Sequence, residues 1–294
     1  MPLHSFTRRL PGAALAAAAL LFTLSACTPG STTDRPGAGT APSIAASGLP
    51  SSHVHGLTVI GDTGQVLLAT HDGLFDVTTS PATKIGDTND LMGFTTVGDK
   101  GPFYASGHPG PESDLPNPMG LLKSSDGGKT WEQLSRQGES DFHAMTITKS
   151  GIIAFDGTLR TSPDGKTWTT ASAGFAPAVL AGHPGSDTVL ATTEEGIQRS
   201  TDAGATWKPL DGGPVIQFAA FANPAEAVGV EPDGTVHYSA DGGRTWTQKG
   251  RIDAQVVAVA AVKGEDGIPW IWAATPDGIV SSTDGGMTFR PAGA

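Results

Sequence analysis

Three short segments of the sequence begin with side chains that could coordinate a metal ion. They are His53-Val54-His55-Gly56-Leu57-Thr58, Asp90-Leu91-Met92-Gly93-Phe94-Thr95 and Asp141-Phe142-His143-Ala144-Met145-Thr146. Their alignment places His55, Met92 and His143 at one position, and His53, Asp90 and Asp141 two residues earlier. Imidazole with thioether favours copper, particularly Cu(I), and imidazole with carboxylate suits zinc or Cu(II).

Two more histidines fall in loops that would open on the same side. His71 lies in one loop, and His108 lies in a longer one, residues 106–118. Long loops on a regular scaffold commonly carry binding residues. The metal hypothesis therefore draws its ligands from six residues, with copper or zinc as the expected ion: His53, His55, Met92, His143, His71 and His108. Two interpretations stay open beside it: purely structural roles, or hydrogen bonding to a glycan or peptide.

Acid–base catalysis would need a pair of carboxylates. The same segments and the long loop offer four candidates: Asp90, Asp141, Glu112 and Asp114. The sequence has no phosphate loop, dinucleotide fingerprint or Gly-x-Ser-x-Gly elbow, and its one cysteine allows neither a disulfide framework nor a thiolate zinc site. A formal charge of −11 argues against non-specific binding of nucleic acid. These observations favour ligand binding over catalysis.

The elements that would position these side chains come from a repeat that starts at His53. Each of six units has an apolar strand, a second strand, a turn and a third strand. Units two to six then have a motif with Ser, Asp, Gly, Thr and an aromatic residue, whereas unit one has Val77-Thr78-Thr79-Ser80 there instead. The motif aspartates lie 38, 38, 39 and 43 residues apart: Asp126, Asp164, Asp202, Asp241 and Asp284. A period of about 40 residues with short strands predicts an all-β fold, a six-bladed β-propeller over residues 51–294. The first strand of each blade would border the central channel, so the three segments would meet at one channel mouth.

The repeated motif, for example Ser124-Ser125-Asp126-Gly127-Gly128-Lys129-Thr130-Trp131, resembles the Asp-box, or BNR repeat, of sialidase-type propellers. The chain also looks like uncharacterised bacterial lipoproteins labelled glycosyl-hydrolase-like. The resemblance implies that the five motif aspartates are structural and lie on the face opposite the usual active site. It also implies a set of sialidase residues that is missing here, since no Arg-Ile-Pro occurs and no arginine lies between Arg35 and Arg136. We expect no sialidase activity; another glycoside hydrolase or a glycan-binding protein is the alternative.

The N-terminal segment has the features of an export signal. Arg8 and Arg9 precede an apolar run, residues 10–26, that is short for a spanning helix and ends in Leu24-Ser25-Ala26-Cys27. This ending resembles the bacterial lipobox, in which the cysteine becomes the lipidated first residue. The sequence therefore predicts a signal peptide over residues 1–26 and a lipidated, flexible linker over residues 27–50, rich in Pro, Gly, Ser and Thr.

Together these patterns predict an exported, monomeric propeller held at the extracytoplasmic face of the cell membrane by the lipid on Cys27 alone. Its expected function is non-catalytic binding at the channel mouth. The ligand would be a copper or zinc ion, another small ligand, a glycan or a protein, and not nucleic acid.

Overall fold

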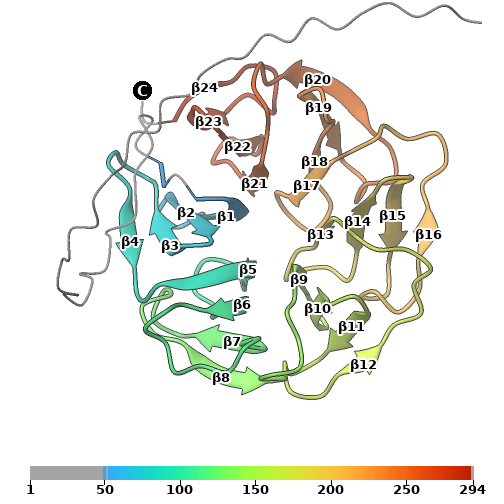
Figure 1. Cartoon of the computed structure of the whole chain (residues 1–294). Helices are drawn as coiled ribbons and strands as arrows, with labels where there is room; N and C mark the ends of the chain where they lie inside the picture. Colours follow the sequence, from blue (N-terminus) through green and yellow to red (C-terminus); the bar gives the residue numbers. More distant parts are fainter. Residues whose placement is uncertain (1–48, 51, 293–294) are drawn as a thin grey trace, which may run out of the picture. The chain divides into compact units, whose positions relative to one another are not determined.

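The computed structural model describes residues 49–50 and 52–292. These residues form six four-stranded antiparallel sheets, arranged as the blades of a ring (Figure 1), and the inner strands of the blades line a central channel. The all-β, six-bladed propeller predicted from the repeat is confirmed. The predicted signal peptide, residues 1–26, the lipidation site Cys27 and the linker up to residue 48 lie outside the described residues. In the described part, no helix has the length and apolar character needed to cross a membrane.

Each blade is one continuous stretch of chain, and its strands follow sequence order from the channel outward. Blades 1 and 2 contain β1 (Val54–Ile60), β2 (Gln65–Thr70), β3 (Gly73–Asp76), β4 (Thr83–Ile85), β5 (Asn89–Thr96), β6 (Phe103–Pro109), β7 (Leu121–Ser124) and β8 (Glu132–Ser135). Blades 3 and 4 contain β9 (Ala144–Thr148), β10 (Gly151–Phe155), β11 (Leu159–Ser162), β12 (Thr169–Thr170), β13 (Val179–Ala181), β14 (Val189–Thr193), β15 (Gly196–Ser200) and β16 (Lys208–Pro209). Blades 5 and 6 contain β17 (Phe218–Phe221), β18 (Ala227–Val230), β19 (Thr235–Ser239), β20 (Thr247–Arg251), β21 (Ala258–Lys263), β22 (Pro269–Thr275), β23 (Gly278–Ser282) and β24 (Arg290–Pro291).

The ring closes by side-chain packing between blades 1 and 6. Among the described strands none is exchanged between these two blades. Instead, Val59 and Leu68 of blade 1 belong to one buried cluster with Ala258 and Ala274 of blade 6. Apolar residues alternate along the strands, so each blade has an apolar face. Burial of these faces between neighbouring blades holds the ring together.

Small residues allow the inner strands to approach one another near the axis. Gly93 of β5 is the clearest case, because a Cβ there would lie 2.2 Å from the carbonyl oxygen of Phe142, just before β9. We expect Gly93→Ala to push blades 2 and 3 apart and to lower the free energy of unfolding by about 1–3 kcal/mol. Thermal denaturation would measure this against Gly174→Ala, whose added Cβ would meet nothing within 4 Å. Equal stability of the two variants would contradict the close approach.

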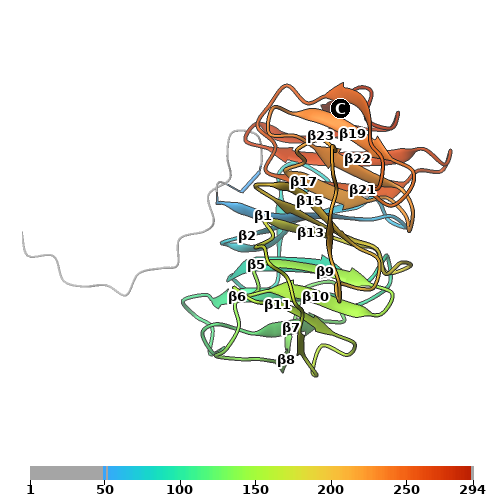
Figure 2. The same cartoon turned by 90° about the vertical axis from the view of Figure 1, so that its right-hand side faces the viewer.

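The strands run roughly along the ring axis, so the two ends of the channel carry different loops (Figure 2). Because consecutive strands are antiparallel, the connections that lead into the inner strands and the loops between second and third strands share one end. The turns between third and fourth strands, which contain the five motif aspartates, lie at the other end.

These five turns are built alike, as the turn of blade 5 illustrates. Asp241 Oδ1 accepts hydrogen bonds from the Ser239 hydroxyl (2.9 Å) and from the backbone N–H of Thr245 (2.8 Å), and Oδ2 accepts from the Thr245 hydroxyl (2.7 Å). Ser239 Oγ in turn accepts from the N–H of Gly243 (2.8 Å). The same bonds to the motif threonine hold the other four carboxylates: Asp126, Asp164, Asp202 and Asp284.

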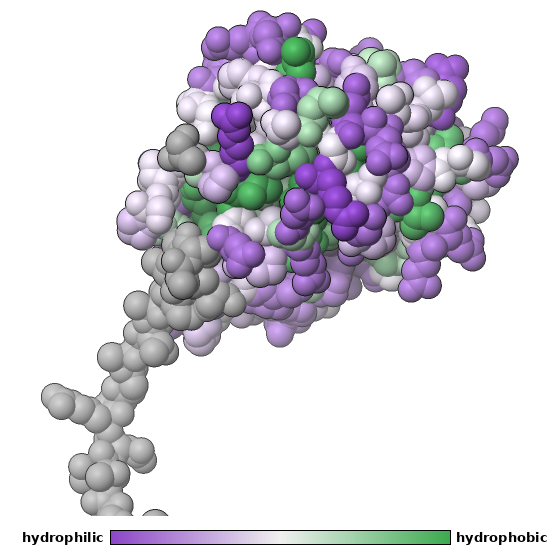
Figure 3. Space-filling view, turned by 90° about the horizontal axis from the view of Figure 1, so that it is seen from above, coloured by the Kyte–Doolittle hydropathy of each residue, from purple (hydrophilic) through white to green (hydrophobic). Residues whose placement is uncertain are grey.

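The described surface mixes polar residues with small apolar areas. On the side of the ring in Figure 3, hydrophilic residues surround the hydrophobic ones. The well-exposed large apolar side chains among the described residues are Val215, Ile268 and Met287, and none of them lies in a strand. Scattered exposure of this kind is ordinary on the surface of a folded domain.

Candidate metal centre

Eight polar or sulfur-containing side chains gather at the channel end where the inner strands of blades 1–3 begin. We call this end the histidine mouth, and it comprises His53, His55, His71, Asp90, Met92, His108, Asp141 and His143. Of these, His55, Met92 and His143 line the channel itself. His53 and Asp141 lie in the connections that precede inner strands, and His71 lies in the β2–β3 loop.

Two of the inner strands contain a bulge at the aligned position. The register of β1 with β2 shifts between Val54 and Gly56, so His55 is the extra residue. The register of β5 with β6 shifts between Leu91 and Gly93, and there Met92 is the extra residue. A bulge interrupts the regular alternation of side chains and redirects the extra one. The bulge in β1 thus decides where the His55 ring points.

Three imidazole rings pack together at this end of blade 1. The ring centroids of His53 and His55 are 4.9 Å apart, those of His55 and His71 are 4.5 Å apart, and those of His53 and His71 are 5.5 Å apart. One nitrogen from each ring can be chosen so that all three lie within 4.8 Å of one another. Three converging ring nitrogens form a set of ligands that suits zinc or copper.

Asp90 of β5 adds an oxygen donor to this set. Its Oδ2 lies 2.8 Å from Nδ1 of His71, and its Oδ1 lies 3.6 Å from Nε2 of His55. The two ring nitrogens are themselves 3.4 Å apart. With bonds of about 2.0–2.2 Å, the donors of a tetrahedral zinc ion are separated by about 3.3–3.6 Å. The separations of His55 from His71 (3.4 Å) and from Asp90 Oδ1 (3.6 Å) are close to those of a coordinated ion. The 2.8 Å between His71 and Asp90 Oδ2 is a hydrogen-bonding distance, so these two atoms would have to move apart for both to bind one ion.

Electrostatics keep His55 in the form that binds metals. The pKa of its imidazole is lowered from 6.5 to about 4, first by burial and then by the neighbouring His71, against the opposing charge of Asp90. His55 is therefore neutral at pH 7, and an ion would not have to displace a proton from its lone pair.

A second group forms around Asp141 and has a different character. Asp141 Oδ2 lies 2.6 Å from His143 Nε2 and 3.1 Å from His108 Nε2. The opposite nitrogen of His108, Nδ1, donates to Asn117 Oδ1 at 2.7 Å. This bond to Asn117 raises the pKa of His108, and the charges of Asp141 and Asp90 add to the effect while burial opposes it. With an acceptor at each nitrogen, His108 is suited to the protonated form, which makes an ion pair with Asp141.

The pKa values of His55 and His108 should therefore lie on opposite sides of the usual histidine value of about 6.5. In metal-free protein, we expect the ring-proton resonances of His55 to shift with a midpoint near pH 4, and those of His108 above the usual value. A pH series of NMR spectra would measure both midpoints, with His55→Ala and His108→Ala used for assignment. A His55 midpoint near that of free histidine would contradict the burial of its ring.

Two carboxylate oxygens at the mouth accept no hydrogen bond. Oδ1 of Asp90 and Oδ1 of Asp141 are shielded from solvent and accept no hydrogen bond from a described residue. An unsatisfied buried acceptor costs about 1–3 kcal/mol, and more when it carries charge. A cation bound beside Asp90 would remove this cost.

The candidates chosen from the sequence do not form a single cluster in the structure. It brings His53, His55 and His71 together with Asp90, and it places His108 and His143 on Asp141. The sulfur of Met92 makes no polar contact with a described residue, although the side chain borders the channel. Glu112 and Asp114 are exposed in the long loop, and their carboxylates pair with no described residue. Sequence reasoning missed Asn117, whose only signal was its place in that loop.

This protein resembles known proteins in fold and not in sequence. No protein-family model matches the sequence, and no curated protein matches it. The structure is similar to a GH74 enzyme of Niastella koreensis, with a TM-score of 0.54 and 17% identity over 82% of this chain and 37% of that enzyme. It is similar to the WD40 propeller domain of Doa1, with a TM-score of 0.54 and 11% identity over 82% of each chain.

The WD40 repeats of RRP9 give a TM-score of 0.53 at 10% identity, over 82% of this chain and 79% of that one. This chain spans little more than a third of the GH74 enzyme that it matches. At such identities the similarity shows that these proteins share the propeller architecture, and it transfers no activity.

Proposed function

We propose that this protein binds a zinc or copper ion at the histidine mouth, through His53, His55 and His71 with Asp90 as a further ligand or as the partner of His71. The observation that carries the proposal is the convergence of three ring nitrogens and a carboxylate whose buried Oδ1 accepts no hydrogen bond. The ring nitrogens and the carboxylate suit zinc and Cu(II).

The first test is elemental analysis of the purified full-length protein after growth with added zinc and copper. We expect one equivalent of one of these metals, retained through dialysis against buffer and removed by a strong chelator. Protein that carries no more metal than a chelator-stripped sample would rule out the proposal.

We further propose that the protein is exported and anchored by a lipid on Cys27, and that its five Ser–Asp turns are Asp-boxes. The support for the anchor is the apolar run that ends in Leu24-Ser25-Ala26-Cys27. We expect Cys27→Ala to move the protein from the membrane fraction to the soluble exported fraction, which fractionation of cells would show. A variant that stays in the membrane fraction would contradict lipid anchoring.

A glycoside hydrolase or a glycan-binding protein is the alternative. It is favoured by the two carboxylates, Asp90 and Asp141, that lie at the same mouth. Each of them is already paired with imidazole rings. This arrangement suits a carboxylate that orients histidine rings better than one that transfers a proton to a sugar. A panel of α- and β-linked glycosides tests this alternative, and we expect no turnover.

A further inference from the structure

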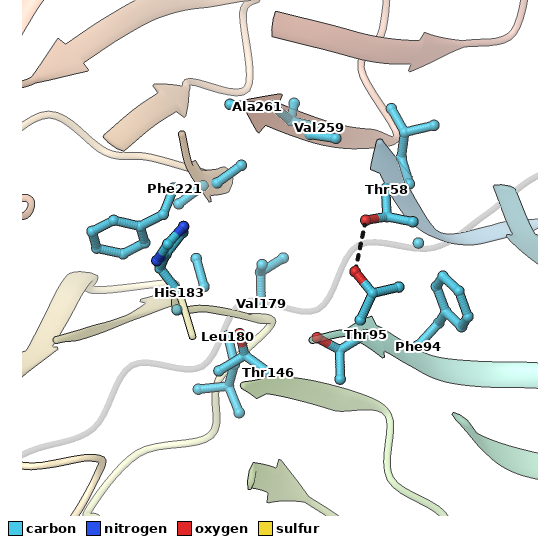
Figure 4. Close-up of a pocket in the computed structure, with 18 of the residues that line it drawn as sticks. Thr58, Phe94, Thr95, Thr146, Val179, Leu180, His183, Phe221, Val259 and Ala261 are labelled. Atoms are coloured by element: carbon cyan, nitrogen blue, oxygen red, sulfur yellow. Dashed lines mark hydrogen bonds between the residues drawn. The ribbon is translucent and has the colours of Figure 1, made fainter. Parts of the chain in front are cut away.

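The channel between the two mouths is a second place where a ligand could bind. It encloses a cavity of about 600 Å³, lined by the inner strands of all six blades (Figure 4). Sites for small organic molecules usually measure about 300–1,000 Å³. The cavity is therefore far larger than a metal ion needs, and the metal proposal does not account for it.

The walls of this cavity differ from one half of the ring to the other. Blades 1–3 contribute all of its hydroxyl side chains, among them Thr58, Thr95 and Thr146, beside apolar residues such as Phe94, whereas blades 4–6 contribute no hydroxyl side chain and line it with Val179, Phe221 and Val259 (Figure 4). The hydroxyl groups of Thr95 and Thr146 form no hydrogen bond with a described residue, so they are free to bond a ligand.

Ionisable side chains border the cavity only near its ends. His55 and His143 stand at the histidine mouth, and Asp62, Asp99 and Lys263 stand where β1, β5 and β21 end. His183 follows β13 at that second end, where its Nδ1 accepts the N–H of Gly185 (2.9 Å). The middle of the cavity thus offers hydroxyl groups and apolar surface but no charge, and a charged ligand would lose its hydration there without compensation.

We propose that the channel binds a neutral, elongated organic molecule that is apolar along one side and has hydrogen-bonding groups along the other. The apolar side lies against Val179 and Val259, and the polar side faces the threonines of blades 1–3. This binding is separate from that of the metal, because the threonines and the apolar residues contribute no ligand to the ion.

The probe for this site is N-phenyl-1-naphthylamine, a neutral two-ring amine with one N–H donor, whose fluorescence rises in apolar surroundings. It is titrated into chelator-treated full-length protein, so that the result does not depend on bound metal. We expect a saturable rise in fluorescence with one probe molecule per protein.

Two variants fill the cavity from different blades: Val179→Trp from blade 4 and Ala261→Trp from blade 6. Each should weaken probe binding by about tenfold or more, because the indole occupies the space that the probe needs. Met287→Trp adds the same indole to an exposed turn that does not line the cavity, and it should bind the probe as the unmodified protein does.

Circular dichroism identifies the variants that fold, and either cavity variant is sufficient for the test. The proposal is overturned if the unmodified protein gives no saturable signal, or if a folded cavity variant binds the probe as tightly as Met287→Trp. Metal analysis of the same samples tests the histidine mouth separately, so that one proposal can fail while the other holds.

Discussion

The double variant His55→Ala/His71→Ala should lose metal binding while it keeps the propeller fold. These two residues supply the nitrogens that lie 3.4 Å apart beside Asp90. Changes to groups that only support a ligand typically cost about 10–100-fold in metal affinity, so removing two direct ligands should cost more than about 100-fold. Competition titration with a chromophoric chelator would measure the affinity, and circular dichroism would report the fold.

The matched control is His183→Ala, a histidine that lies at the opposite end of the channel. It should leave metal affinity unchanged, since its ring is part of neither group at the histidine mouth. Asp90→Asn provides an intermediate case, because it keeps the size of the side chain and removes its charge. We expect it to weaken binding by about 10–100-fold. Full metal binding by the double variant would remove the proposed centre altogether.

His143→Ala distinguishes the two groups of histidines within the same mouth. The sequence alignment makes His143 equivalent to His55, but in the structure its ring pairs with Asp141 at 2.6 Å and is largely exposed. A metal held by the blade 1 histidines should therefore survive this substitution with little change in affinity. Loss of the metal in His143→Ala would instead place the ion between the two groups.

The arrangement of the blades could be predicted from sequence because it depends on a repeated local signal. Aspartates that recur every 38 to 43 residues mark the third turn of successive blades, and the strands between them follow from apolar alternation. Once the inner strands are located, His55, Met92 and His143 are expected at the channel, and all three line it.

The partners within the mouth could not be predicted in the same way. The bulges at His55 and Met92 depend on how β1 and β5 pair with their neighbours, and a single strand carries no mark of its register. Likewise, Asn117 reaches His108 through a long loop without any periodicity. The alignment therefore groups six candidate ligands together, whereas in the structure the five histidines divide into two groups around Asp90 and Asp141 and Met92 joins neither.

Replacement of a turn aspartate should produce the largest loss of stability. In Asp241→Ala, the hydroxyl groups of Ser239 and Thr245 and the N–H groups of Arg244 and Thr245 all lose their acceptor. Hydrogen bonds to charged groups are worth more than neutral ones, and we expect the free energy of unfolding to fall by about 2–4 kcal/mol. For a domain of this size, thermal denaturation should show a drop in Tm of about 5–10 °C.

Asp277→Ala is the control for this effect, since Asp277 lies in an exposed hairpin turn of blade 6 and its carboxylate pairs with no described residue. It should unfold at nearly the temperature of the unmodified protein. Similar losses in the two variants would mean that the Ser–Asp–Thr bonds contribute nothing specific to the fold.

The same bonds predict how stability depends on pH. Burial alone would raise the pKa of Asp241, but hydrogen bonds from Thr245 and Ser239 outweigh it and lower the pKa to about 2. The unfolded carboxyl group has a pKa of about 3.9, so its stabilising contribution is complete above that pH and is lost as the pH falls toward 2. The pKa is equally low, about 2, for three other turn aspartates: Asp126, Asp164 and Asp284. The same loss of stability at low pH is therefore expected at each of these turns.

Asp241→Asn separates this charge effect from the loss of an acceptor. The amide oxygen can still accept from the turn N–H groups, but it no longer titrates. Its stability should therefore fall less steeply than that of the unmodified protein between about pH 4 and pH 2, as denaturant titrations at several pH values would show. Parallel curves for the two proteins would mean that the turn carboxylates are not selectively stabilised in the folded state.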